Sequence, residues 1–171
     1  MPTPALWVVA GWADQAGALH GRLQFSNMDV VMRSRGNNPK RRIVLPGHFT
    51  AAELAEFAAR ARYEGSALHK LRPADYDFDP PANPRPSKSV CDDLRVIKLR
   101  EARALLDAAF THGMISACDP KALPKYAWAV DEEGEAYEAK LGRNGYHGYR
   151  LGEDDSVMRD WVIDEWRERA G

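Results

Sequence analysis

The first part of the chain alternates short apolar runs with polar, turn-forming stretches. Four runs of four or five strand-forming residues stand out, at 5–9, 22–25, 29–33 and 42–45. Glycine, asparagine and proline gather between the runs, most densely at 35–39 (Arg-Gly-Asn-Asn-Pro). Such clusters mark turns between strands. The spacing therefore predicts an antiparallel β meander before residue 50.

The pattern changes to a helical period after this region. Thr50 and Glu53 have the spacing of a capping box, in which each side chain bonds the backbone N–H group of the other residue. Apolar residues then recur three and four positions apart, at Leu54, Phe57, Ala58 and Ala61. We expect a helix here, with Gly65 as its natural stop.

Two more helices are predicted further along the chain. The first spans 98–112 and ends before Gly113, with a buried face of Leu99, Ala102, Leu106, Ala109 and Phe110. The second spans 156–169 after two aspartates that favour a helix N-terminus, with inward side chains Val157, Trp161, Val162 and Trp166.

Two strand-like segments lie between these helices. They span 126–130 (Tyr-Ala-Trp-Ala-Val) and 136–141 (Ala-Tyr-Glu-Ala-Lys-Leu), and a turn-forming Asp-Glu-Glu-Gly stretch separates them. This arrangement predicts a β-hairpin with a longer loop. The predicted fold class is α+β: antiparallel sheet structure with about three helices, in the order meander, helix, loop, helix, hairpin, helix.

A proline-rich loop divides the chain. Residues 66–90 hold five of the 11 prolines, which favour extended backbone. Loops of this length are usually functional or act as linkers. We expect either a single domain over 1–171 or two lobes, 1–65 and 91–171, joined by the loop.

Composition favours an ordinary globular protein. The chain has 171 residues, of which 44% are hydrophobic and 29% charged. Its two cysteines, Cys91 and Cys118, form no C-x-x-C pair, so we expect free thiols in a reducing compartment. No cationic leader and no apolar run of about 20 residues is visible, so we expect a cytoplasmic protein without a membrane partner.

Charge is distributed unevenly along the chain. The net charge is −1, but residues 33–103 carry 15 Lys and Arg against nine Asp and Glu. This basic middle is typical of a footprint for an anionic ligand, or of a segment that packs against acidic parts of the same chain. The densest basic run includes Arg41 and Arg42, which on a hairpin would face phosphate.

A first candidate site opens the proline-rich loop. It consists of His69, Lys70 and Arg72, with Lys88 at the far end of the loop. Histidine can transfer a proton near neutral pH, and Lys or Arg can stabilise charge on phosphoryl oxygens. We therefore predict catalytic roles for His69 and Lys70, and substrate binding by Arg72 and Lys88; the alternative is a solvated basic turn.

A second candidate site follows the hairpin, at Tyr-His-Gly-Tyr. The glycines at 142, 145 and 148 permit close approach of backbone to a ligand, and the two tyrosines can stack on bases. We predict catalytic roles for His147 and Tyr149 and substrate binding by Tyr146; the alternative is an aromatic corner over the sheet edge. No metal-binding, nucleotide-binding or serine-hydrolase motif is present, so we expect no metal and no cofactor.

The C-terminal half resembles the toxin ribonuclease domains of the barnase, EndoU, colicin and RelE-like group. The resemblance covers about 70 residues: the helix at 99–112, the hairpin YAWAVDEEGEAYEAKL and the segment GYHGY. It implies helices packed on a small antiparallel sheet, and RNA cleavage by acid–base chemistry without metal.

Three functional interpretations follow. The leading one is a metal-independent ribonuclease with RNA as partner, which requires the fold to bring His69 and His147 together. The second is a protein-binding module, such as an immunity protein, an antitoxin or a phage-encoded inhibitor, with a cognate protein partner. The third is a nucleotide enzyme similar to ADP-ribosyl transferases. The sequence leaves the oligomeric state open.

Overall fold

The sheet of this protein has three antiparallel strands in the order β1-β2-β3, as seen in a computed structural model that describes residues 38–84 and 88–171. The strands are β1 (Tyr126–Val130), β2 (Ala136–Leu141) and β3 (Tyr146–Arg150). The helices are α1 (Ala51–Arg60), α2 (Leu99–Thr111) and α3 (Ser156–Ala170). The α+β prediction is confirmed, and the predicted hairpin has the observed bounds. The expected strands before residue 38 lie outside the described residues.

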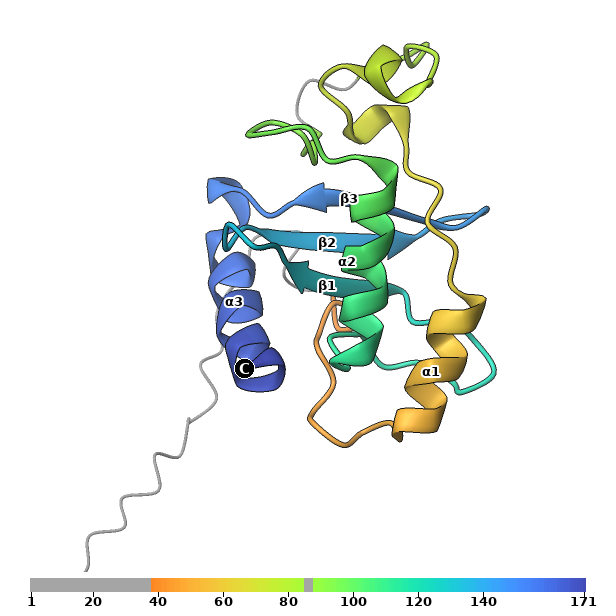
Figure 1. Cartoon of the computed structure of the whole chain (residues 1–171), viewed down its shortest axis with the longest axis vertical. Helices are drawn as coiled ribbons and strands as arrows, with labels where there is room; N and C mark the ends of the chain where they lie inside the picture. The colour runs from red at the N-terminus through yellow and green to blue at the C-terminus, as the bar shows by residue number, and fades with distance from the viewer. Residues whose placement is uncertain (1–37, 85–87) are drawn as a thin grey trace, which may run out of the picture. The chain divides into compact units, whose positions relative to one another are not determined.

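Helix α2 packs across one face of the sheet, and α1 packs against α2 (Figure 1). The sheet residues that face α2 have small side chains. They are Ala127, Ala139 and Gly148, which lie opposite one another on adjacent strands. Small residues let the helix approach the strands closely. Ala102, Leu106, Ala109 and Phe110 of α2 are buried as predicted, but Leu99 is exposed.

Local signals explain the ends of the helices. The Thr50–Glu53 capping box forms as predicted. Helix α1 ends at Arg60, earlier than expected, although Gly65 has the positive φ of a chain reversal. At the end of α2, Gly113 takes a positive φ, and the N–H groups of Gly113 and Met114 bond to Phe110 and Ala109. This is a Schellman motif, which explains the predicted stop.

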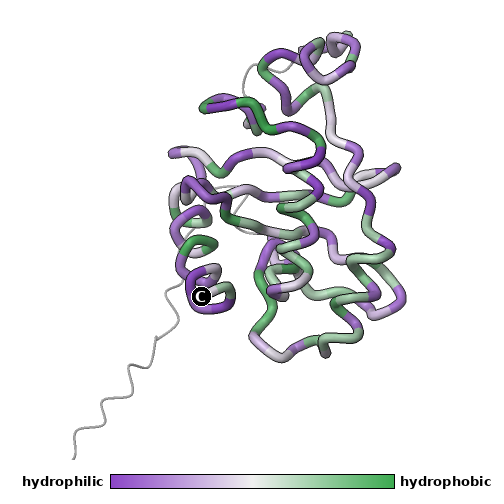
Figure 2. Tube along the Cα trace, viewed as in Figure 1, coloured by the Kyte–Doolittle hydropathy of each residue, from purple (hydrophilic) through white to green (hydrophobic). Residues whose placement is uncertain are grey.

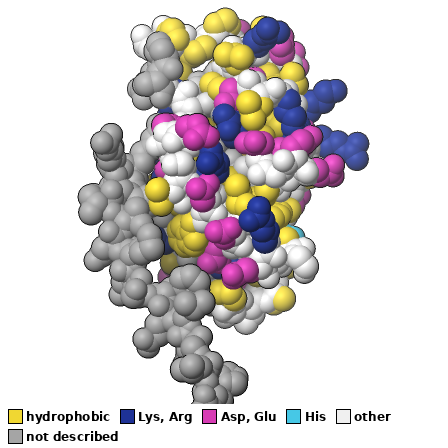
Figure 3. All heavy atoms as spheres, turned by 90° about the vertical axis from the view of Figure 1, so that its left-hand side faces the viewer, with side chains coloured by type: hydrophobic (Ala, Val, Ile, Leu, Met, Phe, Trp, Pro, Cys, Tyr) yellow, Lys and Arg dark blue, Asp and Glu magenta, His cyan; other side chains and the backbone are white. Residues whose placement is uncertain are grey.

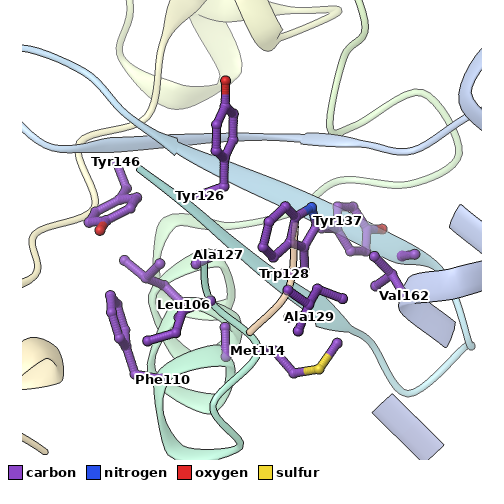
Figure 4. Packing of buried hydrophobic residues seen from close by; sticks show 14 of the residues in the cluster. Leu106, Phe110, Met114, Tyr126, Ala127, Trp128, Ala129, Tyr137, Tyr146 and Val162 are labelled. Carbon is purple, nitrogen blue, oxygen red and sulfur yellow. The ribbon is translucent and has the colours of Figure 1, made fainter. Parts of the chain in front are cut away.

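The core draws on both sides of the proline-rich loop. Phe57 precedes the loop, while Phe110, Trp128 and Tyr146 follow it, and all belong to one buried cluster (Figure 4). Helix α3 packs beside β1 and β2 and is largely hydrophilic (Figure 2). Its buried residues are Met158 and Val162; Val157, expected inside, is exposed.

Two segments differ from the predicted elements. Residues 42–45, expected as a strand, make only an isolated bridge between Ile43 and Ser116. The Tyr-His-Gly-Tyr segment, which the sequence did not predict as a strand, is most of β3. The described part of the proline-rich loop contains two short 3-10 turns, η1 (Ala67–His69) and η2 (Pro73–Tyr76). Among the described helices, none is long and apolar enough to span a membrane.

Candidate functional site

The face of the sheet away from α2 carries two rows of large polar and aromatic side chains. Opposite residues on adjacent strands share a face, and successive residues alternate between faces. The register therefore puts two rows of three residues on this face, Tyr126–Lys140–His147 and Trp128–Glu138–Tyr149. Together the rows form the floor of a polar site.

A cavity of about 270 Å³ lies over this floor. Its volume lies just below the roughly 300–1,000 Å³ of small-molecule sites, so it has room for only a small group. Segments distant in sequence contribute to its wall: the stretch before α1, turn η1, the loop after it, and all three strands. The lining residues are Asn38, Arg41, His69, Lys88, Ser89, Tyr126, Glu138, Lys140, His147 and Tyr149.

His69 stacks on both His147 and Tyr149. The ring centroids are 5.1 Å apart for His69 and His147 and 5.0 Å apart for His69 and Tyr149, with 19° between the planes in each pair. His147 and Tyr149 are two positions apart on β3 and so lie on the same face, where one ring can contact both. Two imidazoles therefore border the same cavity.

Turn η1 and the loop that follows it hold His69 in place. Its backbone carbonyl accepts a hydrogen bond from Cys91 N–H, and its Nδ1 lies 2.7 Å from the carbonyl oxygen of Ser89. A carbonyl oxygen can only accept, so Nδ1 carries a proton. The Ser89 carbonyl therefore accepts from Nδ1–H and orients the imidazole ring.

His147 lies in a basic environment. Burial lowers the pKa of His147, and the positive charges of Lys88, Lys140 and Lys125 lower it further. Each of these effects disfavours the imidazolium form. At neutral pH the ring is therefore mainly neutral and able to accept a proton.

A buried ionic network supports the floor of the cavity. Glu138 is fully buried and accepts hydrogen bonds from Arg41 Nε at 2.6 Å, from Trp128 Nε1 at 2.8 Å and from the hydroxyl of Tyr149. Arg41 also donates two hydrogen bonds to Asp155. Burial lowers the pKa of Arg41, but the hydrogen bond to Asp155 and the two carboxylate charges outweigh it and raise the pKa overall. The network fixes Tyr149 beneath His69.

The structure brings five of the nine predicted site residues to the cavity. These are His69, His147, Tyr149, Lys88 and Arg41. We expected Arg41 to belong to an exposed patch that faces phosphate. Instead, Arg41 is buried and paired with Glu138 and Asp155.

The other four predicted residues do not line this cavity. Lys70 is buried elsewhere, where its Nζ donates to the carbonyl of Ile97 and lies 3.6 Å from the ring centre of Tyr76. Arg72 and Arg42 are exposed. Tyr146 points from the opposite face of β3 toward Phe110 (Figure 4), and its hydroxyl donates to the carbonyl of Pro124. It is a core residue, because strand alternation separates it from His147.

Five lining residues were missed by sequence reasoning. Glu138 and Lys140 fall in the predicted strand, and the alternation of that strand already placed them on one face. Tyr126 belongs to the same row as Lys140, and its hydroxyl accepts a hydrogen bond from Asn38 Nδ2 at 3.0 Å. For Asn38 and Ser89 the sequence held no signal, since they reach the site only through the tertiary fold.

The cysteines are free thiols, as predicted. Burial raises the pKa of Cys91, and burial likewise raises that of Cys118, so neither thiol is activated as a nucleophile. Among residues 38–84 and 88–171, no group of three or more His, Cys, Asp and Glu side chains is arranged to hold a metal ion.

Comparison of the chain with protein-family models, with curated proteins and with solved structures found no significant match. The chemistry of the cavity must therefore be argued from its own residues.

Proposed function

We propose that this protein is a ribonuclease that cleaves RNA by histidine acid–base catalysis. The observation that carries the proposal is the pairing of His69 and His147 at one cavity that also contains Lys88 and Lys140. Two imidazoles can supply both proton transfers of phosphodiester cleavage, and lysines stabilise the charge that develops on the phosphate.

The proposed reaction is an internal transesterification. The ribose 2′-oxygen attacks the adjacent phosphorus while a base removes its proton. The bond from phosphorus to the 5′-oxygen of the next nucleotide breaks, and an acid protonates that oxygen. The products are a 2′,3′-cyclic phosphate and a free 5′-hydroxyl, so the reaction needs no metal, cofactor or external oxidant.

The electrostatics favour His147 as the base. Burial and three lysines keep its ring neutral near pH 7, which is the form that accepts a proton. His69 then acts as the acid. The carbonyl of Ser89 can hold the Nδ1 proton of its imidazolium while Nε2 delivers a proton to the leaving oxygen.

Tyr149 has a positioning role in this mechanism. Its hydroxyl donates to Glu138, and its ring stacks on His69. The ring therefore acts through His69 and does not itself transfer a proton to substrate. Lys88 and Lys140 replace Lys70 and Arg72 as the residues that hold the scissile phosphate.

The cavity supports an enzyme over the protein-binding alternative. A protein-binding module is favoured by a defined aromatic or acidic patch without a concave site. Trp128 is fully buried, and Trp161 and Trp166 are partly buried against the core, so none is an exposed interface anchor. On the face drawn in Figure 3, acidic and basic side chains are interspersed.

The test is cleavage of a labelled 12-nucleotide RNA by purified protein in EDTA, with DNA of the same sequence beside it. We expect cleavage of the RNA alone, with cyclic phosphate ends detected by mass spectrometry. His69→Ala and His147→Ala should each lose roughly 10²–10⁴-fold in rate. His48→Ala is the matched control, because His48 is exposed and lies outside the cavity lining. Wild-type protein that leaves RNA intact would overturn the proposal.

A further inference from the structure

The cavity has a basic end. Lys140 lies opposite His147 on the neighbouring strand, and its Nζ is 5.8 Å from the ring centre of Tyr126. Lys125 immediately precedes β1, is exposed, and donates from Nζ to the carbonyl of Leu141 at 2.6 Å. Both cations are close enough to His147 to lower its pKa. They therefore extend the positive field beyond the cavity wall along one end of the sheet.

The other end of the site has mixed charge. A neighbouring cavity of about 370 Å³ shares Lys88 and Ser89 with the first, and its wall also includes Arg150, Asp93, Glu153 and Asp154. Asp93 pairs with Arg150 and Glu153 pairs with Arg159, so these two carboxylates are neutralised. A nucleic-acid strand that enters the site is therefore favoured at the lysine end.

The cations at the basic end differ in their partners from three arginines of the protein. Within the described part of the chain, no Asp or Glu forms an ion pair with Lys125 or Lys140, whereas Arg41, Arg95 and Arg150 each contact two or more carboxylates. A cation without such a partner contributes its full charge to binding an anionic ligand.

We propose that Lys125 and Lys140 form a phosphate-binding track for single-stranded RNA that continues out of the cavity. This inference rests on the proposed ribonuclease function and specifies its substrate. In this proposal the scissile phosphate lies at the cavity, and an adjacent phosphate of the same strand is bound by the two lysines. The preferred substrate is therefore an oligonucleotide, not a dinucleoside monophosphate, because the latter has no second phosphate to reach Lys125.

Binding of a 2′-O-methyl 12-nucleotide RNA, which has no free 2′-hydroxyl and is not cleaved, tests the track directly. Fluorescence anisotropy over a range of NaCl concentrations gives Kd and its salt dependence. Lys125→Gln should weaken binding severalfold at low salt and reduce the slope of log K against log salt by about 0.7, the value for one phosphate contact on a single strand. Lys125→Arg should restore both values. Lys121→Gln is the matched control, because Lys121 is an exposed lysine in the same loop and, unlike Lys125, is not among the cations that lower the pKa of His147.

Cleavage separates the two proposals. Lys125→Gln should reduce kcat/KM more for a 12-nucleotide RNA than for a dinucleoside monophosphate. Equal binding by Lys125→Gln and Lys121→Gln would overturn the track and leave histidine catalysis standing. Wild-type protein that binds the 12-mer through Lys125 but cuts no RNA would overturn the ribonuclease function and leave the track standing.

Discussion

The imidazole ring of His69 stacks on that of His147, with 5.1 Å between ring centres, although one residue lies on turn η1 and the other on strand β3. The Ser89 carbonyl orients the first ring, and strand pairing with Lys140 fixes the backbone that carries the second. Two separate supports thus hold two imidazoles at one cavity. Such preorganisation is what acid–base catalysis requires.

Substrates with different leaving groups should distinguish the two histidines. A nucleoside 3′-(4-nitrophenyl phosphate) releases nitrophenolate, which leaves without protonation and so needs no general acid. We expect His69→Ala to lose roughly 10²–10⁴-fold on RNA and far less on the aryl ester, while His147→Ala loses comparably on both. Steady-state rates on the two substrates measure this. The reverse pattern would exchange the roles of acid and base, and equal losses for both variants would contradict the division of labour.

The pKa of His147 should respond to Lys140. Burial and lysine charges lower this pKa below its ordinary value of 6.5. Removing one positive charge by Lys140→Gln stabilises the imidazolium, so the pKa must rise. The acidic limb of the kcat/KM profile, where the base becomes protonated, should move to higher pH. NMR titration of the His147 ring measures the shift directly, with Lys121→Gln as control. A wild-type His147 pKa above 6.5 would contradict this account.

Much of the fold was accessible from sequence because its signals are local. The capping box at Thr50, the helical period of α2 and the turn between β1 and β2 each depend on residues a few positions apart. The sequence did not predict β3, because glycines at 145 and 148 are typical of a loop. In the structure they allow close packing: a Cβ at Gly145 would lie 2.6 Å from the carbonyl oxygen of Arg62.

The site was less accessible because it depends on strand alternation and on tertiary contacts. Strand alternation over Tyr146 to Tyr149 puts Tyr146 on one face and puts His147 and Tyr149 on the other. The sequence did not mark this segment as a strand. The burial of Lys70 beneath Tyr76, and the capture of Arg41 by Glu138 and Asp155, follow from contacts between distant segments. No local pattern encodes those contacts, so charge alone predicted a catalytic role for Lys70 and phosphate binding by Arg41.

The buried pair of Arg41 and Glu138 should contribute strongly to stability. Arg41→Met leaves the Glu138 carboxylate without its cation in a fully buried position, so the free energy of unfolding should fall by about 3–5 kcal/mol. Urea denaturation measures this. Arg159→Met is the control, because Arg159 pairs with the exposed Glu153 and such surface pairs contribute about 0–1 kcal/mol. Similar losses for both variants would show that the buried network has no special role.

The two tyrosines of β3 should behave differently when substituted. Tyr146→Phe removes the donor to the buried Pro124 carbonyl and should lower the free energy of unfolding by about 1–3 kcal/mol, with little change in kcat while the protein is folded.

Tyr149→Phe keeps the ring that stacks on His69 and should retain most activity. Tyr149→Leu removes that ring, and the resulting misplacement of His69 should reduce kcat by up to about 10²-fold. Because a loss of stability alone would not affect one proton transfer more than the other, the decisive readout is the pair of substrates: Tyr149→Leu should lose more rate on RNA than on the 4-nitrophenyl ester, as His69→Ala does. Loss of activity in Tyr149→Phe equal to that in Tyr149→Leu would instead assign a direct chemical role to the hydroxyl.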